Sequence, residues 1–177
     1  MLKPYHPDHF PWMKSLIIEG AGTGVYDRSL RLPNAEIAFF RGLQIGLRTG
    51  HVHGPDGRSE LLHAHLFYAN ENSKKPCGFA LFKGEEQSQM VEFWMASISP
   101  GYRRRGFGFQ LFKEALNLYG NRIIIARCNK GSDVAIRMLA NLRFIHVGTG
   151  NSEGTVFLTS PNTPQKLFDE MKRLFAA

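Results

Sequence analysis

A stretch of three arginines and two glycines with the sequence RRRGFG carries the clearest chemical signal in this chain. Glycines let a backbone approach a ligand closely, and the exposed N–H groups at the start of a helix favour an anion. The stretch therefore predicts a turn that binds phosphate groups. The residues that would form this arginine-glycine turn are Arg103, Arg104, Arg105, Gly106, Phe107 and Gly108.

A strand before the turn and a helix after it must position these groups, and the sequence predicts both. Residues 91–98 are rich in β-branched and aromatic types and are followed by Pro100-Gly101, which is typical of a buried strand and a turn. From Phe107 onward, apolar residues recur at spacings of three and four, so they share one face of a helix of about three turns. The alternative is that the arginines form a solvated charge run and the glycines only make a turn.

The spacing Arg103-x-x-Gly106-x-Gly108 resembles the coenzyme A pyrophosphate loop of the GNAT acetyltransferase superfamily. That loop has the pattern Arg/Gln-x-x-Gly-x-Gly/Ala, whereas a dinucleotide fingerprint needs Gly-x-Gly-x-x-Gly and a Walker loop ends in Gly-Lys-Ser/Thr. The resemblance implies an α/β fold of the α+β type. Its mixed, mostly antiparallel sheet would have about six or seven strands, splayed between the fourth and fifth, and about four or five flanking helices. It also implies acetyl-CoA as cosubstrate, held by the arginine-glycine turn.

A second part of the resemblance lies in the segment SDVAIRMLANLRF, where the family usually has an asparagine, an apolar helix face and then Leu-Gly-Phe. Ser132 stands at the usual asparagine position and Arg143 at the usual glycine. Together with the turn, the resemblance covers residues 60–159. It implies that Ser132 contacts the cofactor, and that backbone N–H groups near Ile98 and Ser99 polarise the acetyl carbonyl.

Acetyl transfer to an amine needs a base for the amine proton, donors to the acetyl oxygen and a proton for the departing thiolate. Glu92 is the candidate base, because it stands in an otherwise apolar strand fourteen positions before Gly106. This resembles the histone-acetylating branch of the superfamily, in which a strand glutamate at that spacing is the base. The alternative is that Glu92 lies at the exposed start of the strand or pairs with a nearby arginine. Many members have a tyrosine as general acid where this chain has Leu139, so water or another tyrosine such as Tyr119 would substitute.

Two pairs of histidines, His51-x-His53 and His63-x-His65, suggest a metal site because alternate residues of a strand share a face. Neither pair has an obvious cysteine or carboxylate to complete a tetrahedral set, so no metal is predicted. Cys128 ends an apolar strand and is predicted to be a core residue rather than a covalent acyl carrier.

The remaining elements follow from hydrophobic periodicity and turn signals. Gly20 is expected to end the first helix, residues 20–33 to form a long loop, and residues 51–57 to form a second loop. Asn34 is expected to cap the second helix. The expected strands are residues 1–5, 61–69, 77–83, 91–98, 122–128, 144–147 and 155–159, and the expected helices begin at Pro7-Asp8, Asn34, Phe107, Ser132-Asp133 and Pro164.

Length and composition predict one globular domain over residues 1–177, because 43% of the residues are hydrophobic and 21% are charged. The sequence has no apolar run of about 18 residues and no signal-peptide pattern, which predicts a soluble protein without a membrane partner. Two cysteines fit a reducing compartment, so a cytoplasmic location is expected. The net charge of +7 predicts an anionic partner, and the phosphates of coenzyme A account for part of it.

Three functions are compatible with these features. The first is an acyl-CoA-dependent N-acyltransferase that moves an acetyl group from acetyl-CoA to a primary amine, by direct transfer in a ternary complex. The second is a non-catalytic component of a larger assembly built on the same fold, which the missing tyrosine at Leu139 favours. A homodimer or larger assembly is also among the expected partners. The third is an RNA or aminoacyl-tRNA acetylating enzyme. Its support is thin, because the basic residues spread from Lys3 to Arg173 without a dominant cluster beyond residues 103–105.

Overall fold

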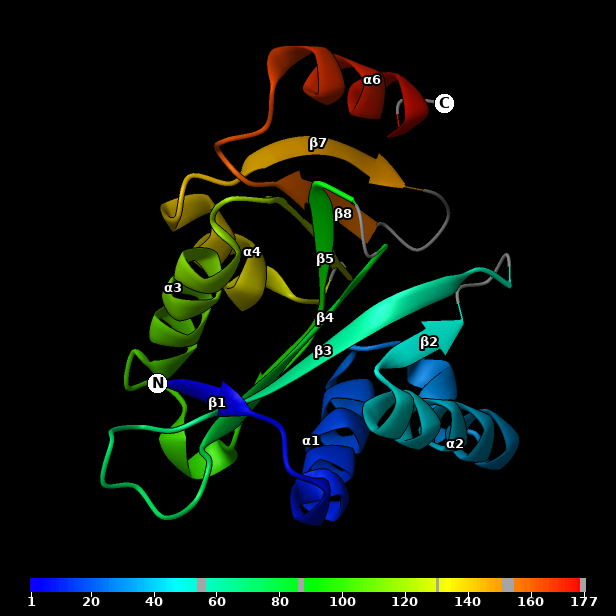
Figure 1. Ribbon diagram of the computed structural model, residues 1–177, viewed down its shortest axis with the longest axis vertical. Coiled ribbons are helices and arrows are strands. Elements are labelled where there is room, and N and C mark those ends of the chain that lie inside the picture. Colours follow the sequence, from blue (N-terminus) through cyan, green and yellow to red (C-terminus); the bar gives the residue numbers. More distant parts are fainter. Residues whose placement is uncertain (54–56, 86–87, 130, 151–154, 176–177) are drawn as a thin grey trace.

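The structure is a computed structural model that describes residues 1–53, 57–85, 88–129, 131–150 and 155–175. The described residues form an eight-stranded sheet in the order β1-β3-β4-β5-β6-β8-β7, with β2 also paired to β3 (Figure 1). Neighbouring strands are antiparallel except for the parallel pair β5–β6. The strands are β1 (Leu2–Pro4), β2 (His51–His53), β3 (Ser59–Phe67), β4 (Gly78–Gly84), β5 (Met90–Ile98), β6 (Ile123–Cys128), β7 (Ile145–Gly150) and β8 (Thr155–Thr159).

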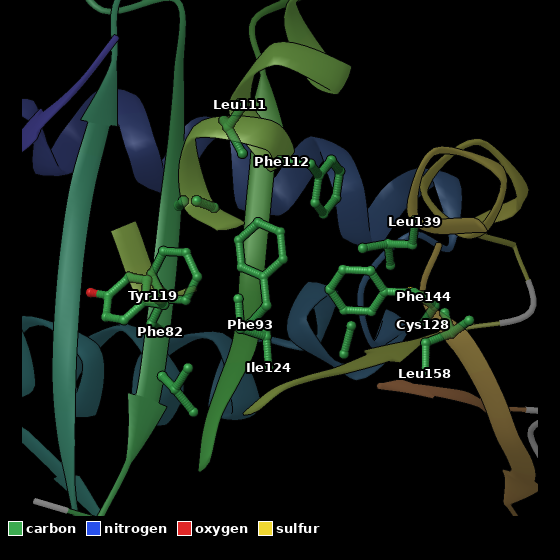
Figure 2. Packing of buried hydrophobic residues seen from close by; sticks show 14 of the residues in the cluster. Phe82, Phe93, Leu111, Phe112, Tyr119, Ile124, Cys128, Leu139, Phe144 and Leu158 are labelled. Atoms are coloured by element: carbon green, nitrogen blue, oxygen red, sulfur yellow. The ribbon is translucent and has the colours of Figure 1, made fainter. Parts of the chain in front are cut away.

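Helices cover both faces of this sheet (Figure 1). On one face, α1 and α2 bury Met13, Ile17 and Leu43 against Phe79 of β4. On the opposite face, α3 and α4 pack over the cluster drawn in Figure 2. Helix α6 packs against β7. The helices are α1 (Phe10–Thr23), α2 (Pro33–Thr49), α3 (Phe107–Tyr119), α4 (Asp133–Asn141) and α6 (Gln165–Phe175), with short 3₁₀ turns η1 (Pro7–His9), η2 (Arg28–Arg31) and η3 (Pro100–Tyr102).

The sheet opens between β5 and β6. Their parallel pairing covers only Met90–Phe93 of β5 and Ile123–Ala126 of β6. At Trp94 a β-bulge shifts the register of β5 against β4, and β5 then continues along β4 while β6 continues along β8. This confirms the predicted splay, because β5 and β6 are the expected fourth and fifth strands. The mixed, mostly antiparallel sheet is also confirmed.

The extra strand is β2, in a segment that was expected to be a loop. His51, Val52 and His53 pair with Leu61, Glu60 and Ser59 of β3. The loop prediction was wrong for these three residues, because β3 begins two residues earlier than expected and its first half needs a partner for its backbone groups. Residues 54–56 of the predicted loop lie outside the described residues.

The first helix continues through Gly20 and ends at Gly24, whose φ of 79° is the left-handed conformation that glycine adopts without strain. Gly20 serves packing instead: a Cβ there would lie 2.5 Å from Cδ2 of Tyr26. The aromatic ring therefore lies directly against the helix backbone at this position. The second helix begins at Pro33 rather than after an Asn34 cap, because proline suits the first helical turn.

The other elements agree with the sequence pattern to within a few residues. Helix α3 buries Leu111, Phe112, Ala115 and Tyr119, as the predicted apolar face required. Within the described ranges, no helix is both long and apolar enough to cross a bilayer.

Candidate functional site

The edge of β5 that faces the splay offers two backbone donors, the N–H groups of Ala96 and Ile98, and the direction of Ser99 shows this. The Ser99 N–H donates to the Cys77 carbonyl at 2.8 Å, so this residue faces the β4 side. Residues of an antiparallel strand alternate between the two neighbouring strands, which turns the N–H and C=O groups of Ala96 and Ile98 toward β6. The two carbonyls agree with this, since the Ile98 carbonyl accepts from Arg103 Nε at 2.8 Å and the Ala96 carbonyl accepts from the Tyr26 hydroxyl.

The two strand-end residues chosen from sequence thus face opposite ways. The Ile98 N–H points into the splay, whereas the Ser99 N–H is already bonded to β4. Ala96, which sequence reasoning did not single out, has the same orientation as Ile98. These directions follow from the register of β5 against β4, in which Ala96 lies opposite Ala80. The sequence alone does not reveal this register.

The arginine-glycine turn lies at the end of this edge and opens directly into α3. Arg104 and Gly106 have φ values of 60° and 81°, so the backbone makes a left-handed turn at both positions. A Cβ on Gly106 would meet nothing within 4 Å, which leaves room for a ligand at the start of the helix. The Gln110 N–H donates to the Gly106 carbonyl at 3.0 Å, and helix geometry leaves the three preceding N–H groups without an intrahelical acceptor. These donors, from Phe107 to Phe109, and the exposed side chains of Arg104 and Arg105 fit a diphosphate.

Gly108 has a different role from Gly106. A Cβ on Gly108 would lie 3.1 Å from Sδ of Met138 in α4. The glycine therefore allows α3 and α4 to approach each other closely, next to the turn.

The Arg103 side chain points away from the open turn. Its Nη1 and Nη2 atoms donate to the two carboxylate oxygens of Glu19 in α1, at 2.6 and 3.1 Å, while its Nε holds the Ile98 carbonyl. The guanidinium thus joins three parts of the chain: the turn, the end of β5 and α1. Its contribution to a ligand site in this arrangement is to fix the turn. Arg104 and Arg105 are also exposed, and they are the other two arginines of the turn.

Glu92 lies in a network of alternating charges that crosses four strands. Its two oxygens accept from Nε and Nη2 of Arg127 on β6 at 2.7 and 2.9 Å, and Lys83 Nζ of β4 lies 3.4 Å away. Lys83 Nζ also donates to Glu60 of β3 at 2.9 Å. The alternative considered from sequence, a pairing of Glu92 with a nearby arginine, is therefore present. Lys83 also lies over the ring of Trp94, which packs with the α1–α2 core, so the network is on that face of the sheet.

A segment after α1 spans the mouth of the splay. In this bridging segment, residues 24–27, Tyr26 contacts β5 and the Val25 carbonyl accepts from Asn129 Nδ2 and Ser132 Oγ, both at 3.3 Å. Ser132 is buried and stands at the N-cap position of α4, which begins at Asp133, so the predicted helix start is confirmed. Sequence reasoning missed Tyr26, because the stretch GAGTGVYDRSLRLP has no periodicity and its partner on β5 lies 70 positions further along the chain.

The residues considered for proton transfer to the thiolate lie in the core under α3 and α4. Leu139 is almost fully buried beside Phe144 (Figure 2). The Tyr119 hydroxyl shares a hydrogen bond of 3.0 Å with His65 Nε2, on the sheet face opposite the Glu92 network. Burial raises the pKa of Tyr119 to about 12 and lowers the pKa of His65 to about 4.

Cys128 belongs to the same core, as predicted (Figure 2). Burial raises the pKa of its thiol to about 11, which keeps the sulfur protonated and poorly nucleophilic near neutral pH. Across the described part of the chain, no three histidine, cysteine or acidic side chains converge to hold a metal ion.

The model of one family, described as Acetyltransferase (GNAT) family, matches residues 40–144. A search of curated protein sequences gave no significant match. Many solved structures share the fold, among them the three that follow. The spermidine N-acetyltransferase from Vibrio cholerae in complex with CoA and spermine has a TM-score of 0.63 and 13% identity, over 90% of this chain and 92% of that chain. The ribosomal-protein-alanine N-acetyltransferase from Brucella melitensis has a TM-score of 0.60 and 14% identity, over 90% and 98%. The protein yncA from Salmonella typhimurium, solved with its cofactor acetyl-CoA, has a TM-score of 0.60 and 13% identity, over 93% and 95%.

The family match covers more than half of the chain and includes the arginine-glycine turn, both strands of the splay and all of α4. The fold of the similar structures agrees with it over nine-tenths of the sequence. The chain therefore belongs to the GNAT family of N-acetyltransferases, and acetyl-CoA is the cosubstrate of that family.

Proposed function

We propose that this protein transfers an acetyl group from acetyl-CoA to a primary amine by direct transfer in a ternary complex. One observation carries the proposal: the splay-facing edge of β5 leads, through the short 3₁₀ turn η3, to the arginine-glycine turn. Bound acetyl-CoA would supply an activated thioester, whose bond to sulfur breaks as the acetyl group bonds to the amine nitrogen. The other requirements fall on side chains and backbone groups of this chain and, for the proton of the thiolate, on water.

The donor site is assigned to groups that the fold leaves open. The N–H groups that begin α3 and the side chains of Arg104 and Arg105 would bind the diphosphate, with Gly106 providing space. The N–H groups of Ala96 and Ile98 would bind the pantetheine arm and the acetyl oxygen. Ser132 would contribute its hydroxyl after release of the Val25 carbonyl, and Ser99 has only its side chain to offer because its N–H is bonded.

Glu92 remains the proposed base. Arg127 has a side chain that is 45% exposed, so it can exchange its hydrogen bonds to Glu92 for bonds to water. A carboxylate oxygen released in this way could accept the amine proton from an acceptor on the α1–α2 face. Water is the proposed proton source for the leaving thiolate, because Tyr119 lies on the opposite face and Leu139 lies in the core.

The donor assignment is tested by Gly106→Glu, which places a carboxylate where the diphosphate would bind. We expect acetyl-CoA binding, measured by titration calorimetry, to be lost. Gly50→Glu is the matched control: Gly50 has nearly the same φ, 76° against 81°, and a Cβ there also meets nothing within 4 Å. Unchanged affinity in Gly106→Glu would remove the cofactor site from this turn.

The catalytic assignment is tested by Glu92→Gln in an assay with amine acceptors. Spermine and a peptide that begins with alanine are reasonable first probes, because similar structures are named for polyamine and ribosomal-protein-alanine acetylation. We expect turnover to fall by about 10²- to 10⁴-fold while acetyl-CoA affinity is unchanged. Equal turnover in wild type and Glu92→Gln would contradict the role of Glu92.

A non-catalytic component that keeps the fold is the second candidate. The ion pairs of Glu92 favour it, because they occupy both carboxylate oxygens, and so does the apolar, buried Leu139 at the position where the family usually has a tyrosine. Acetyl-CoA binding without turnover of any amine would support this candidate. The cytoplasmic location, the single domain over residues 1–177, the homodimer or larger assembly and the binding of RNA stay predictions.

A further inference from the structure

Tyr26 is the one side chain of the bridging segment that reaches the reactive edge of β5. Its ring lies against the backbone of α1 at Gly20, where a Cβ would be 2.5 Å from the ring. Its N–H donates to the Gly20 carbonyl at 3.3 Å, and its hydroxyl donates to the Ala96 carbonyl at 2.5 Å. The ring is therefore held at one end by α1 and at the other by β5.

The hydroxyl is suited to a permanent donor role. Burial raises the pKa of Tyr26 well above its usual value, although Arg103 and the hydrogen bond to Ala96 oppose the shift. The phenol thus stays protonated throughout the physiological pH range. Its proton is directed at a backbone oxygen, so Tyr26 is placed to hold the strand and not to give its proton to a leaving group.

The Ala96 carbonyl needs such a partner because β6 has already diverged. Parallel pairing with β6 ends at Phe93, so among the described residues no strand pairs with the splay-facing carbonyls beyond it. Side chains take the place of the missing strand: the Tyr26 hydroxyl donates to the Ala96 carbonyl, and Arg103 Nε donates to the Ile98 carbonyl. In an extended strand the N–H and C=O of one residue point to the same side, so a bond that fixes the Ala96 carbonyl also fixes the direction of its N–H.

We propose that Tyr26 is a positioning residue, which aims the Ala96 N–H at the acetyl oxygen of the donor. The inference rests on the proposed function, because it needs acetyl-CoA in the splay. It separates two tasks along one edge: the Ala96 N–H contacts the acetyl group alone, whereas the Ile98 N–H and the arginine-glycine turn contact parts shared by acetyl-CoA and CoA. Loss of the Tyr26 hydroxyl should then affect acetyl-CoA and spare CoA.

The test compares the dissociation constants of acetyl-CoA and CoA for the full chain, measured by titration calorimetry. We expect the wild type to prefer acetyl-CoA by about threefold to tenfold, the range of one added hydrogen bond. Tyr26→Phe should bind CoA as the wild type does and lose this preference. Tyr5→Phe is the matched control, because the Tyr5 hydroxyl also donates to a backbone carbonyl, that of Pro7, away from the splay.

A second variant moves the same hydroxyl without deleting it. Gly20→Ala adds a methyl group where only the Tyr26 ring fits, whereas Gly22→Ala in the same helix adds one in open space. Alanine favours a helix interior, so both variants should fold. Gly20→Ala should lose the preference for acetyl-CoA, and Gly22→Ala should keep it.

Each of the remaining outcomes would contradict either the role of Tyr26 or the proposed function. A wild type without preference, or a preference retained in Tyr26→Phe, would overturn the role of Tyr26 and leave the proposed function standing. Equal weakening of both ligands in Tyr26→Phe would show that the residue only supports the fold, and would also overturn the positioning role. A wild type that binds neither ligand would remove the proposed function, and this inference with it.

Discussion

Lys83 is the buried cation on which the charge network of the sheet depends. Its side chain is 8% exposed, and its Nζ lies 2.9 Å from Glu60 and 3.4 Å from Glu92. Lys83→Met would leave two carboxylates close together in a poorly solvated place, with Arg127 able to compensate only one of them. We expect the free energy of unfolding to fall by about 3 kcal/mol, measured by urea denaturation.

A matched pair elsewhere in the chain provides the control for this variant. Lys14 pairs with Glu36 at 2.7 Å and lies over the ring of Phe40, much as Lys83 lies over Trp94, but the Lys14 side chain is 39% exposed. Lys14→Met should therefore cost less than about 1 kcal/mol, as is usual for solvated ion pairs. Equal losses in the free energy of unfolding would show that burial does not make the ion pairs of Lys83 more important for stability than that of Lys14.

His65 should make the stability of the protein depend on pH. Its pKa is lowered from 6.5 to about 4, mainly by burial and to a smaller extent by the nearby His63. Between these two pH values the unfolded chain binds a proton at this position that the folded chain does not bind. Stability should therefore fall as the pH drops from about 6.5 toward 4, and should not depend on His65 above that window. Because the ring is partly solvated, we expect a loss of about 2 kcal/mol.

Urea denaturation at pH 7 and pH 4.5 checks this expectation. His65→Gln should show a smaller drop in stability between the two pH values than the wild type. His53→Gln is the control, because His53 is exposed on a short edge strand. A pH dependence that is identical in the wild type and His65→Gln would show that other groups cause it.

At the scale of elements, the ion pair between Glu19 and Arg103 ties α1 to the turn that would hold the diphosphate. Both side chains are more than a third exposed, so Glu19→Gln should change stability by less than about 1 kcal/mol. We expect it to weaken acetyl-CoA binding, measured by titration calorimetry, because the turn and the Ile98 carbonyl lose their anchor. Arg103→Gln should weaken binding by a similar factor.

The sign of the Glu19→Gln effect separates two roles for Arg103. If Arg103 only supplied positive charge to the phosphates, removal of a nearby carboxylate would strengthen the binding of an anion. Tighter binding of acetyl-CoA by Glu19→Gln would thus contradict the anchoring role. Gln110→Ala, on the exposed side of α3, serves as a control for changes near the turn that leave this pair intact.

Local patterns were enough to predict the elements around the splay. The β-branched and aromatic residues of β5, the proline and glycines after it and the apolar spacing of α3 each lie within a few residues of one another. Such signals depend on short-range sterics and on one buried face, which the sequence displays directly. The position of Gly20 misled the prediction, because a glycine that admits a ring looks the same in sequence as one that ends a helix.

The contacts that define the site could not be predicted in the same way. Arg103 meets Glu19 across 84 positions, Tyr26 meets Ala96 across 70, and Arg127 meets Glu92 across 35. Each contact depends on how the helices lie on the sheet and on a bulge that shifts the register of β5. Arg103 illustrates the consequence: its type and spacing predicted a phosphate ligand, and its observed partners are a carboxylate and a carbonyl.

At the scale of the whole molecule, ion pairs near the splay show which part of the net charge of +7 stays available to an anionic ligand. Three carboxylates of the sheet and of α1 are held by cations: Glu19 by Arg103, Glu92 by Arg127, and Glu60 by Lys83. Arg104 and Arg105 remain exposed beside them. The turn therefore presents positive charge that these carboxylates do not cancel, at the place where an anionic ligand would arrive.

The two halves of the sheet are joined along only four residues of parallel pairing, Met90–Phe93 with Ile123–Ala126. Beyond that pairing, the bridging segment connects Ala96 on one side to Asn129 and Ser132 on the other through Tyr26 and Val25. A ligand in the splay would contact both sides, and ligand binding stabilises the state that binds it. Acetyl-CoA should therefore slow amide hydrogen exchange in residues 94–98, at the start of α4 and in the bridging segment, while β1 and β2 at the far edge keep their rates. Protection confined to the start of α3 would mean that the turn binds phosphate without the ligand entering the splay, and uniform protection would mean that the halves already behave as one unit.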